Sequence, residues 1–207
     1  MDEMAPNVLL EDGRRPVYFC MLDLPSKPFW NAEECGAQEL VAVLREHKTK
    51  LLEEVQCLRG HGKDHGNGWS VFTVVGDGKP PATNECPLLI SILRQFPSCV
   101  SFDCPFQASL ISVLGPHGSV KSHFGPTNFR LRLQFLLTSE SNGCWLRCGK
   151  EESRYDGGFA IIDDSFCHSA GNPSEEDRIV LVIDLWHPGI TKEERMHMEM
   201  KLKEIES

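Results

Sequence analysis

Two histidines and two arginines stand beside predicted strands in the C-terminal half of the sequence. His123 precedes one of these strands and His168 follows another, while Arg132 lies within the first and Arg178 opens the last. If the first two strands are neighbours at the mouth of a barrel, their ends bring the imidazoles together. Imidazole is a common ligand of transition metals, and arginine binds a carboxylate through a two-pronged hydrogen bond. The pattern indicates a metal site beside a carboxylate site.

The segment 128–137 (NFRLRLQFLL) alternates between two kinds of side chain. One face carries Phe129, Leu131, Leu133, Phe135 and Leu137, and the other carries Asn128, Arg130, Arg132 and Gln134. Such alternation usually marks a strand with one face in solvent. In a jelly roll, however, the second face lines the interior, where two arginines require anions.

Spacing alone leaves other roles open for these side chains. On spacing alone, a single histidine in a strand-rich chain is more often a hydrogen-bonded structural residue than a metal ligand. His187, in Trp186-His187-Pro188, competes as a third ligand but also fits an anchored corner. Asp163 and Asp164 also compete as a third ligand, but Asp163 fits a turn residue better, and Asp164 fits a residue that orients a histidine. His61 and His65 lie in the glycine-rich segment 60–68 (GHGKDHGNG), which we expect to be a surface loop that closes over the active site.

The elements that must position these residues are short strands separated by glycine and proline. They suggest a β-sandwich or jelly roll. The expected strands are 106–113, 128–137, 145–148, 159–162 and 178–185. Helical periodicity predicts helices over 31–60, 87–95 and 191–205, the last with Thr191 as its N-cap and Glu194 completing a capping box.

Composition excludes several classes of protein. The 207 residues carry a net charge of −9 without a basic run, so we expect no nucleic-acid partner. Neither a signal peptide nor an apolar stretch of membrane-spanning length is visible, and we expect a cytoplasmic protein. The nine cysteines include no Cys-x-x-Cys pair and are interpreted as reduced, mostly buried thiols.

Three longer segments resemble the aspartyl/asparaginyl β-hydroxylase family. They are 122–132 (SHFGPTNFRLR), 163–168 (DDSFCH) and 178–188 (RIVLVIDLWHP), and they occur in the family's order and approximate spacing. Weaker similarities lie upstream, at Pro28-Phe29-Trp30 and over 86–97. The resemblance implies an Fe(II)- and 2-oxoglutarate-dependent dioxygenase with a double-stranded β-helix, jelly-roll or cupin-like, mainly β with flanking helices.

The resemblance also implies roles for individual residues. His123 and His168 would bind iron without a carboxylate, because Gly125 stands where most related oxygenases have Asp or Glu. Arg178, helped by the Ser112 hydroxyl, would bind the distal carboxylate of 2-oxoglutarate, and Arg132 would contact the end near the metal. The family usually has histidine where this chain has Gln134, which can donate a hydrogen bond but carries no charge.

We expect a single oxygenase domain over 1–207, with a helical part over about 1–99, a β-helix core over about 100–190 and a terminal helix over 191–205. The substrate would be a side chain of a protein or peptide, such as Asp or Asn, or a small molecule. Two alternatives are a non-catalytic scaffold protein that keeps the fold, and a cupin-like protein that binds zinc and has no use for Arg178.

Overall fold

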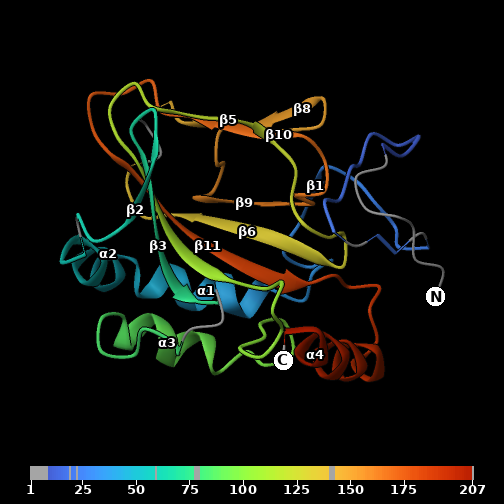
Figure 1. Cartoon of the computed structure of the whole chain (residues 1–207). Coiled ribbons are helices and arrows are strands. Elements are labelled where there is room, and N and C mark those ends of the chain that lie inside the picture. Colours follow the sequence, from blue (N-terminus) through green and yellow to red (C-terminus); the bar gives the residue numbers. More distant parts are fainter. Residues whose placement is uncertain are drawn as a thin grey trace.

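A computed structural model describes residues 9–18, 20–21, 23–58, 60–76, 80–139 and 143–206 of the chain. Two antiparallel sheets face one another, and helices cover the outer face of the larger sheet (Figure 1). In spatial order, the larger sheet comprises β1 (Phe29–Trp30), β9 (Phe159–Ile162), β6 (Arg130–Leu136), β11 (Arg178–Trp186), β4 (Ser109–Leu114), β3 (Trp69–Val75) and β2 (Lys63–Gly66). The smaller sheet comprises β5 (Ser119–His123), β10 (His168–Gly171), β7 (Trp145–Cys148) and β8 (Glu151–Ser153). This arrangement confirms the predicted jelly roll.

Four helices accompany the sheets in the described part of the chain: α1 (Gln38–Glu46), α2 (Lys48–Gln56), α3 (Pro87–Leu93) and α4 (Lys192–Glu206). The predicted capping box of α4 is confirmed, because Thr191 and Glu194 exchange side chain-to-backbone hydrogen bonds of 2.8 and 3.2 Å. None of the helices that the structure describes is long and apolar enough to cross a membrane.

The central strands β6 and β11 are buried on both faces. Leu131 and Leu133 of β6 pack with apolar side chains of α1 and α3, whereas Leu136 packs with side chains of the smaller sheet. The alternation predicted for β6 is therefore correct. Its polar face lies between the two sheets, so Arg130, Arg132 and Gln134 are interior residues.

The single helix expected over 31–60 is wrong in its bounds and its continuity. Residues 31–37 form a turn in which Asn31 and Glu34 bond each other's backbone N–H groups, and Gly36 adopts a left-handed φ of 61°. His47 then leaves helical geometry, with φ −98° and ψ 8°, and separates α1 from α2. Periodicity detected the buried face but not this interruption.

The glycine-rich segment 60–68 is a strand and turn, not the loop that we expected. β2 pairs with β3 to form a hairpin at the edge of the larger sheet. Asn67 and Gly68 at its tip have φ values of 53° and 74°, and an Asn-Gly pair is a strong signal for a tight hairpin turn. The described residues before position 99 thus include three strands as well as helices, so the expected helical part over about 1–99 is mixed.

The N-terminal segment supports the loops that lead into the interior. The N–H groups of Arg15, Val17 and Tyr18 donate to carbonyl oxygens of Ser165, Gly125 and Pro126, at 2.8 to 3.1 Å. Further along, the buried amide of Asn128 accepts from the N–H of Met21 at 2.8 Å and donates to its carbonyl at 2.7 Å. Residues 15–18 and Met21 therefore contact the turn that precedes His168 and the segment that follows His123.

We predict that Asn128→Ala releases this segment. The change leaves both backbone groups of Met21 without their partner, which costs about 1–3 kcal/mol. Urea unfolding should show the loss of stability, and hydrogen exchange should rise first in residues 15–18 and at Met21. Asn84→Ala, at an exposed position, serves as the control and should leave both measurements unchanged. Unaltered exchange of residues 15–18 and Met21 in the Asn128 variant would contradict the supporting role.

Candidate active site

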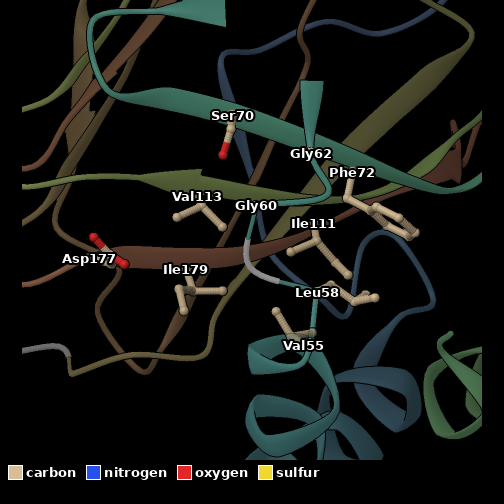
Figure 2. Close-up of a pocket in the computed structure, with 10 residues that line it drawn as sticks. All are labelled: Val55, Leu58, Gly60, Gly62, Ser70, Phe72, Ile111, Val113, Asp177 and Ile179. Carbon is tan, nitrogen blue, oxygen red and sulfur yellow. The ribbon is translucent and has the colours of Figure 1, made fainter. Parts of the chain in front are cut away.

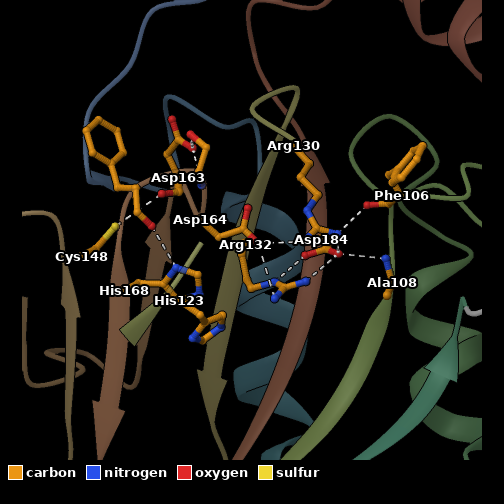
Figure 3. A network of polar contacts seen from close by, with 12 residues as sticks. Phe106, Ala108, His123, Arg130, Arg132, Cys148, Asp163, Asp164, His168 and Asp184 are labelled. Carbon is orange, nitrogen blue, oxygen red and sulfur yellow. Dashed lines mark hydrogen bonds and ion pairs between the residues drawn. The ribbon is translucent and has the colours of Figure 1, made fainter. Parts of the chain in front are cut away.

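His123 ends β5, and His168 begins β10, directly opposite it in the smaller sheet. The two strands are antiparallel, and the two imidazole centroids lie 4.0 Å apart. The register shifts just after His168, and a bulge of this kind re-aims the side chains beside it. The structure thus brings together the two histidines that the sequence analysis placed in one site (Figure 3).

Each imidazole is anchored through its Nδ1 atom. His123 Nδ1 lies 2.8 Å from the carbonyl oxygen of Lys121, and His168 Nδ1 lies 3.0 Å from that of Phe166. A carbonyl oxygen can only accept, so Nδ1 carries the proton in each neutral ring. The Nε2 atom of each ring therefore keeps its lone pair, as a metal ligand requires.

Burial keeps His168 neutral. Its side chain is fully enclosed, and desolvation together with the neighbouring His123 lowers its pKa to about 3. Within the part of the chain that the structure describes, no group of three or more His, Cys, Asp or Glu side chains is arranged to hold a metal. The geometry fits a two-histidine site.

A buried ion-pair network lies beside the histidines (Figure 3). Arg130 donates to Asp164 at 2.7 Å and to Asp184 at 2.6 Å. Arg132 donates twice to Asp184, at 2.8 and 3.1 Å, and its Nη1 atom lies 3.4 Å from Asp164. Burial opposes ionisation of Asp164, but the two guanidinium groups outweigh it and lower the pKa of Asp164 to about 2. The anions that the interior arginines require are Asp164 and Asp184.

Asp164 occupies the space beside Gly125. The Gly125 N–H donates to the Asp164 carbonyl oxygen at 2.6 Å, and a Cβ atom added at Gly125 would overlap the Asp164 carboxyl group. Position 125 therefore has no room for a side chain while Asp164 keeps its ion pairs. One oxygen of Asp164, Oδ1, is buried without a hydrogen-bond partner. Asp164 thus contacts the backbone at Gly125 and pairs with Arg130, and it does not have the histidine-orienting role expected for it.

Arg178 lies at the deeper end of the interior with an unusual set of partners. It is 2% exposed, and its guanidinium donates to Gln134 Oε1 at 2.8 Å and to the Tyr155 hydroxyl. Its Nε atom is buried without a partner. No ion pair joins it to a carboxylate of the described residues. A buried cation with only neutral partners is costly unless an anion binds there.

Ser112 of β4 lines the same cavity as Arg178. Its Oγ accepts a hydrogen bond of 3.0 Å from the indole Nε1 of Trp69. Because the indole can only donate, the hydroxyl proton of Ser112 remains available to another acceptor.

Two cavities that share part of their lining contain these residues. The inner one is lined by both histidines together with Ser112, Arg132, Gln134 and Arg178. The outer one is an open cleft of about 840 Å³ that shares Trp69, His123 and Arg132 with it. All six residues predicted for the metal and cosubstrate therefore line one cavity.

A third cavity, of about 250 Å³, lies on the helix side of the larger sheet (Figure 2). Val55, Ile111 and Ile179 line it and belong to the core between sheet and helices. Its lining has no histidine or arginine among the described residues, so the histidine pair is the stronger candidate for chemistry.

The remaining sequence candidates have structural positions. His187 is buried, and its Nε2 lies 2.9 Å from the Pro25 carbonyl oxygen, which supports the anchored corner over a third metal ligand. Asp163 accepts from the backbone N–H and the hydroxyl of Ser165, as a turn residue does. His61 and His65 line the outer cleft.

Sequence reasoning missed three residues of the site: Asp184, Tyr155 and Trp69. Asp184 had a detectable signal, because a lone carboxylate within the apolar run 179–186 must be paired when the strand is buried. Tyr155 and Trp69 gave no comparable signal, because their contacts come from distant parts of the chain.

The fold and the histidine pair define a double-stranded β-helix protein with a candidate metal site. The sequence model of the family described as aspartyl/asparaginyl beta-hydroxylase matches residues 37–188. The chain belongs to this family of hydroxylases.

Several curated relatives are similar to this chain. Human aspartyl/asparaginyl beta-hydroxylase is 30% identical over 83% of this chain and 24% of its own length. Mouse aspartate beta-hydroxylase domain-containing protein 2 is 29% identical over 90% of this chain and 58% of its own. The chain thus spans only part of these relatives. A solved prolyl hydroxylase in complex with a hypoxia inducible factor peptide fragment, from Trichoplax adhaerens, covers 79% of this chain and 93% of its own chain at 14% identity, with a TM-score of 0.47.

We predict that Gly125→Ala displaces Asp164 and destabilises the fold. Overpacking of a buried position costs about 1–3 kcal/mol, and the strained ion pairs of Asp164 add to this. Thermal unfolding should show the loss. Gly115→Ala is the matched control, because its added Cβ would meet neighbouring atoms only at ordinary distances of 3.5 Å or more. Equal stability of the two variants would rule out the tight packing of Asp164 against Gly125.

Asp163 gives a prediction for pH dependence. Burial, opposed in part by hydrogen bonds from Ser165, raises its pKa from 3.8 to about 7. The folded state therefore keeps the Asp163 carboxyl proton at pH values where the unfolded chain releases it. The free energy of unfolding consequently falls as pH rises from about 4 to about 7. Asp163→Asn keeps the amide oxygen as acceptor and removes this titration. Urea unfolding should show that the variant gains stability relative to the native chain as pH rises; a constant difference would refute the raised pKa.

Proposed function

We propose that this chain is an Fe(II)- and 2-oxoglutarate-dependent dioxygenase that hydroxylates a side chain of a peptide or small-molecule substrate. The observation that carries the proposal is Arg178, a buried cation with no carboxylate partner among the described residues, in the same cavity as two imidazoles whose Nδ1 atoms are anchored and whose Nε2 atoms keep their lone pairs. Family membership supports the reaction class.

The residues present fit a metal ion. His123 and His168 would hold it through their Nε2 atoms, because each Nδ1 atom is occupied by a carbonyl oxygen. The indole of Trp69 lies beside His123, with ring centroids 6.2 Å apart, and forms one wall of the cavity. Together these contacts fix both rings before any metal binds, which favours affinity.

The donors that line the inner cavity, whose volume is about 50 Å³, also match in type the two carboxylate ends of a dicarboxylate. Arg178 and the Ser112 hydroxyl would bind the distal carboxylate, and Arg132 would lie at the end near the metal. The apolar side chains of Leu110, Leu146 and Val182 line the cavity between these points and exclude water. When bound, iron and 2-oxoglutarate would supply dioxygen activation: one oxygen atom of O2 would enter the succinate formed with carbon dioxide from 2-oxoglutarate, and the other would hydroxylate the substrate.

The outer cleft is the proposed substrate site. It opens beside His123 and is bordered by the β2–β3 hairpin and by residues 80–85. The rings of His65 and Trp69 are tilted against each other with their centroids 4.6 Å apart. The hairpin therefore forms a wall of the cleft that continues to the metal site. A volume of about 840 Å³ accommodates several residues of a peptide as readily as a metabolite.

We predict that Arg178→Gln weakens 2-oxoglutarate binding at least about 100-fold, because loss of a buried charged partner costs several kcal/mol. The measurement is calorimetric titration of the Mn(II)-loaded protein. Metal affinity should stay the same, because Arg178 is not a metal ligand. The 2-oxoglutarate affinity of Arg178→Lys should lie between those of the native chain and Arg178→Gln, because a single ammonium charge replaces the two-pronged guanidinium.

The control is Arg154→Gln, an exposed arginine paired with Glu152. Succinate release with Fe(II), assayed against peptide and metabolite pools, then tests turnover. Native protein that binds metal but not 2-oxoglutarate supports the zinc-binding alternative. Binding of both without succinate formation for any substrate supports the scaffold alternative. Unchanged 2-oxoglutarate affinity in Arg178→Gln removes the basis of the proposal.

A further inference from the structure

The amide of Gln134 has its orientation fixed by two donors. Its Oε1 atom lies 2.7 Å from the Tyr155 hydroxyl and 2.8 Å from an Nη atom of Arg178. The Tyr155 hydroxyl in turn accepts from the same Arg178 nitrogen. The three side chains form a closed, buried triangle at the deeper end of the inner cavity.

The chemistry of these groups leaves one arrangement of protons. A guanidinium can only donate, so the amide atom that faces Arg178 must be the oxygen. The Tyr155 hydroxyl has one proton and already accepts from Arg178, so it donates to the same oxygen. The Nε2 atom of Gln134 therefore lies on the opposite branch of the amide. It has no partner among the described residues, and Gln134 lines the cavity.

We propose that Tyr155 is a positioning residue for the cosubstrate site: by donating to Gln134 Oε1, it turns the Gln134 amide nitrogen toward the carboxylate that Arg178 binds. This inference rests on the proposed function. It explains how a neutral side chain can serve where family members usually have histidine. Gln134 supplies a directed hydrogen bond, while Arg178 supplies the charge.

Tyr155 is held firmly enough for this role. Its side chain is fully buried, and the Arg178 guanidinium lies over its ring, 5.0 Å from the ring centroid. Its backbone has a left-handed φ of 61°, which is unfavourable for a residue with a side chain. Its N–H donates to Ser153 Oγ at 3.1 Å, and its carbonyl accepts from Gly158 at 2.7 Å. Burial also raises the pKa of the Tyr155 hydroxyl, so the group keeps its proton.

The test is a double-mutant cycle on 2-oxoglutarate affinity. Tyr155→Phe removes the hydroxyl and keeps the ring, and Gln134→Ala removes the amide. Titration of the Mn(II)-loaded proteins should show that Tyr155→Phe weakens binding about fivefold, the equivalent of one hydrogen bond. In the Gln134→Ala background the same change should have little effect, because the group that Tyr155 orients is gone.

Two measurements separate positioning from a general structural defect. Mn(II) affinity should not change in Tyr155→Phe, since the hydroxyl contacts neither histidine. Tyr18→Phe is the matched control, because Tyr18 is 58% exposed and lies outside the cavity lining. It should leave 2-oxoglutarate affinity unaltered.

The outcomes distinguish this inference from the proposed function. If native protein fails to bind 2-oxoglutarate, the proposed function fails and the inference with it. If native protein binds and Tyr155→Phe binds equally well, only the inference fails. An equal loss for Tyr155→Phe in both backgrounds also overturns it, because Tyr155 would then act independently of Gln134.

Discussion

The ion-pair network of Arg130, Arg132, Asp164 and Asp184 is the interaction on which the site depends. It joins the central strands β6 and β11 to the turn that precedes β10. Buried charges of this kind are stable only when each has a close partner, so the network tolerates little displacement. Through Asp164 it also holds the backbone at Gly125, two residues after His123.

The network also leaves a charge imbalance. Three guanidinium groups face the space between the sheets, whereas Asp164 and Asp184 supply two carboxylates, both committed to Arg130 and Arg132. The pKa of His168 is too low for a further charge at neutral pH. Arg178 is thus the cation left to an external anion, and a metal ion would increase the demand. This imbalance supports the proposed binding of an anionic group at Arg178 independently of any sequence motif.

The sequence predicted the parts of this arrangement that depend on local pattern. The alternation over 128–137 identified an interior polar face, and the pairing of β6 with β9 confirmed the neighbouring strands expected beside the two histidines. The strands that carry the histidines were not predicted, because β5 (SVKSH) and β10 (HSAG) are short and polar or small. These segments are strands because their backbones pair with each other and with β7. The pairing partners are distant in sequence.

The two cavities are built from different parts of the fold. This difference decides which properties of relatives, the reaction or the substrate, can be inferred for this chain. The inner cavity is built mainly from the central strands and the histidine pair. The cleft is bordered by an edge hairpin whose strand β2 is exposed, and by the segment that enters α3. Exposed edge elements vary with little effect on the core. Relatives that share the inner residues are therefore informative about the reaction, whereas the substrate depends on the hairpin and the segment 80–85 of this chain.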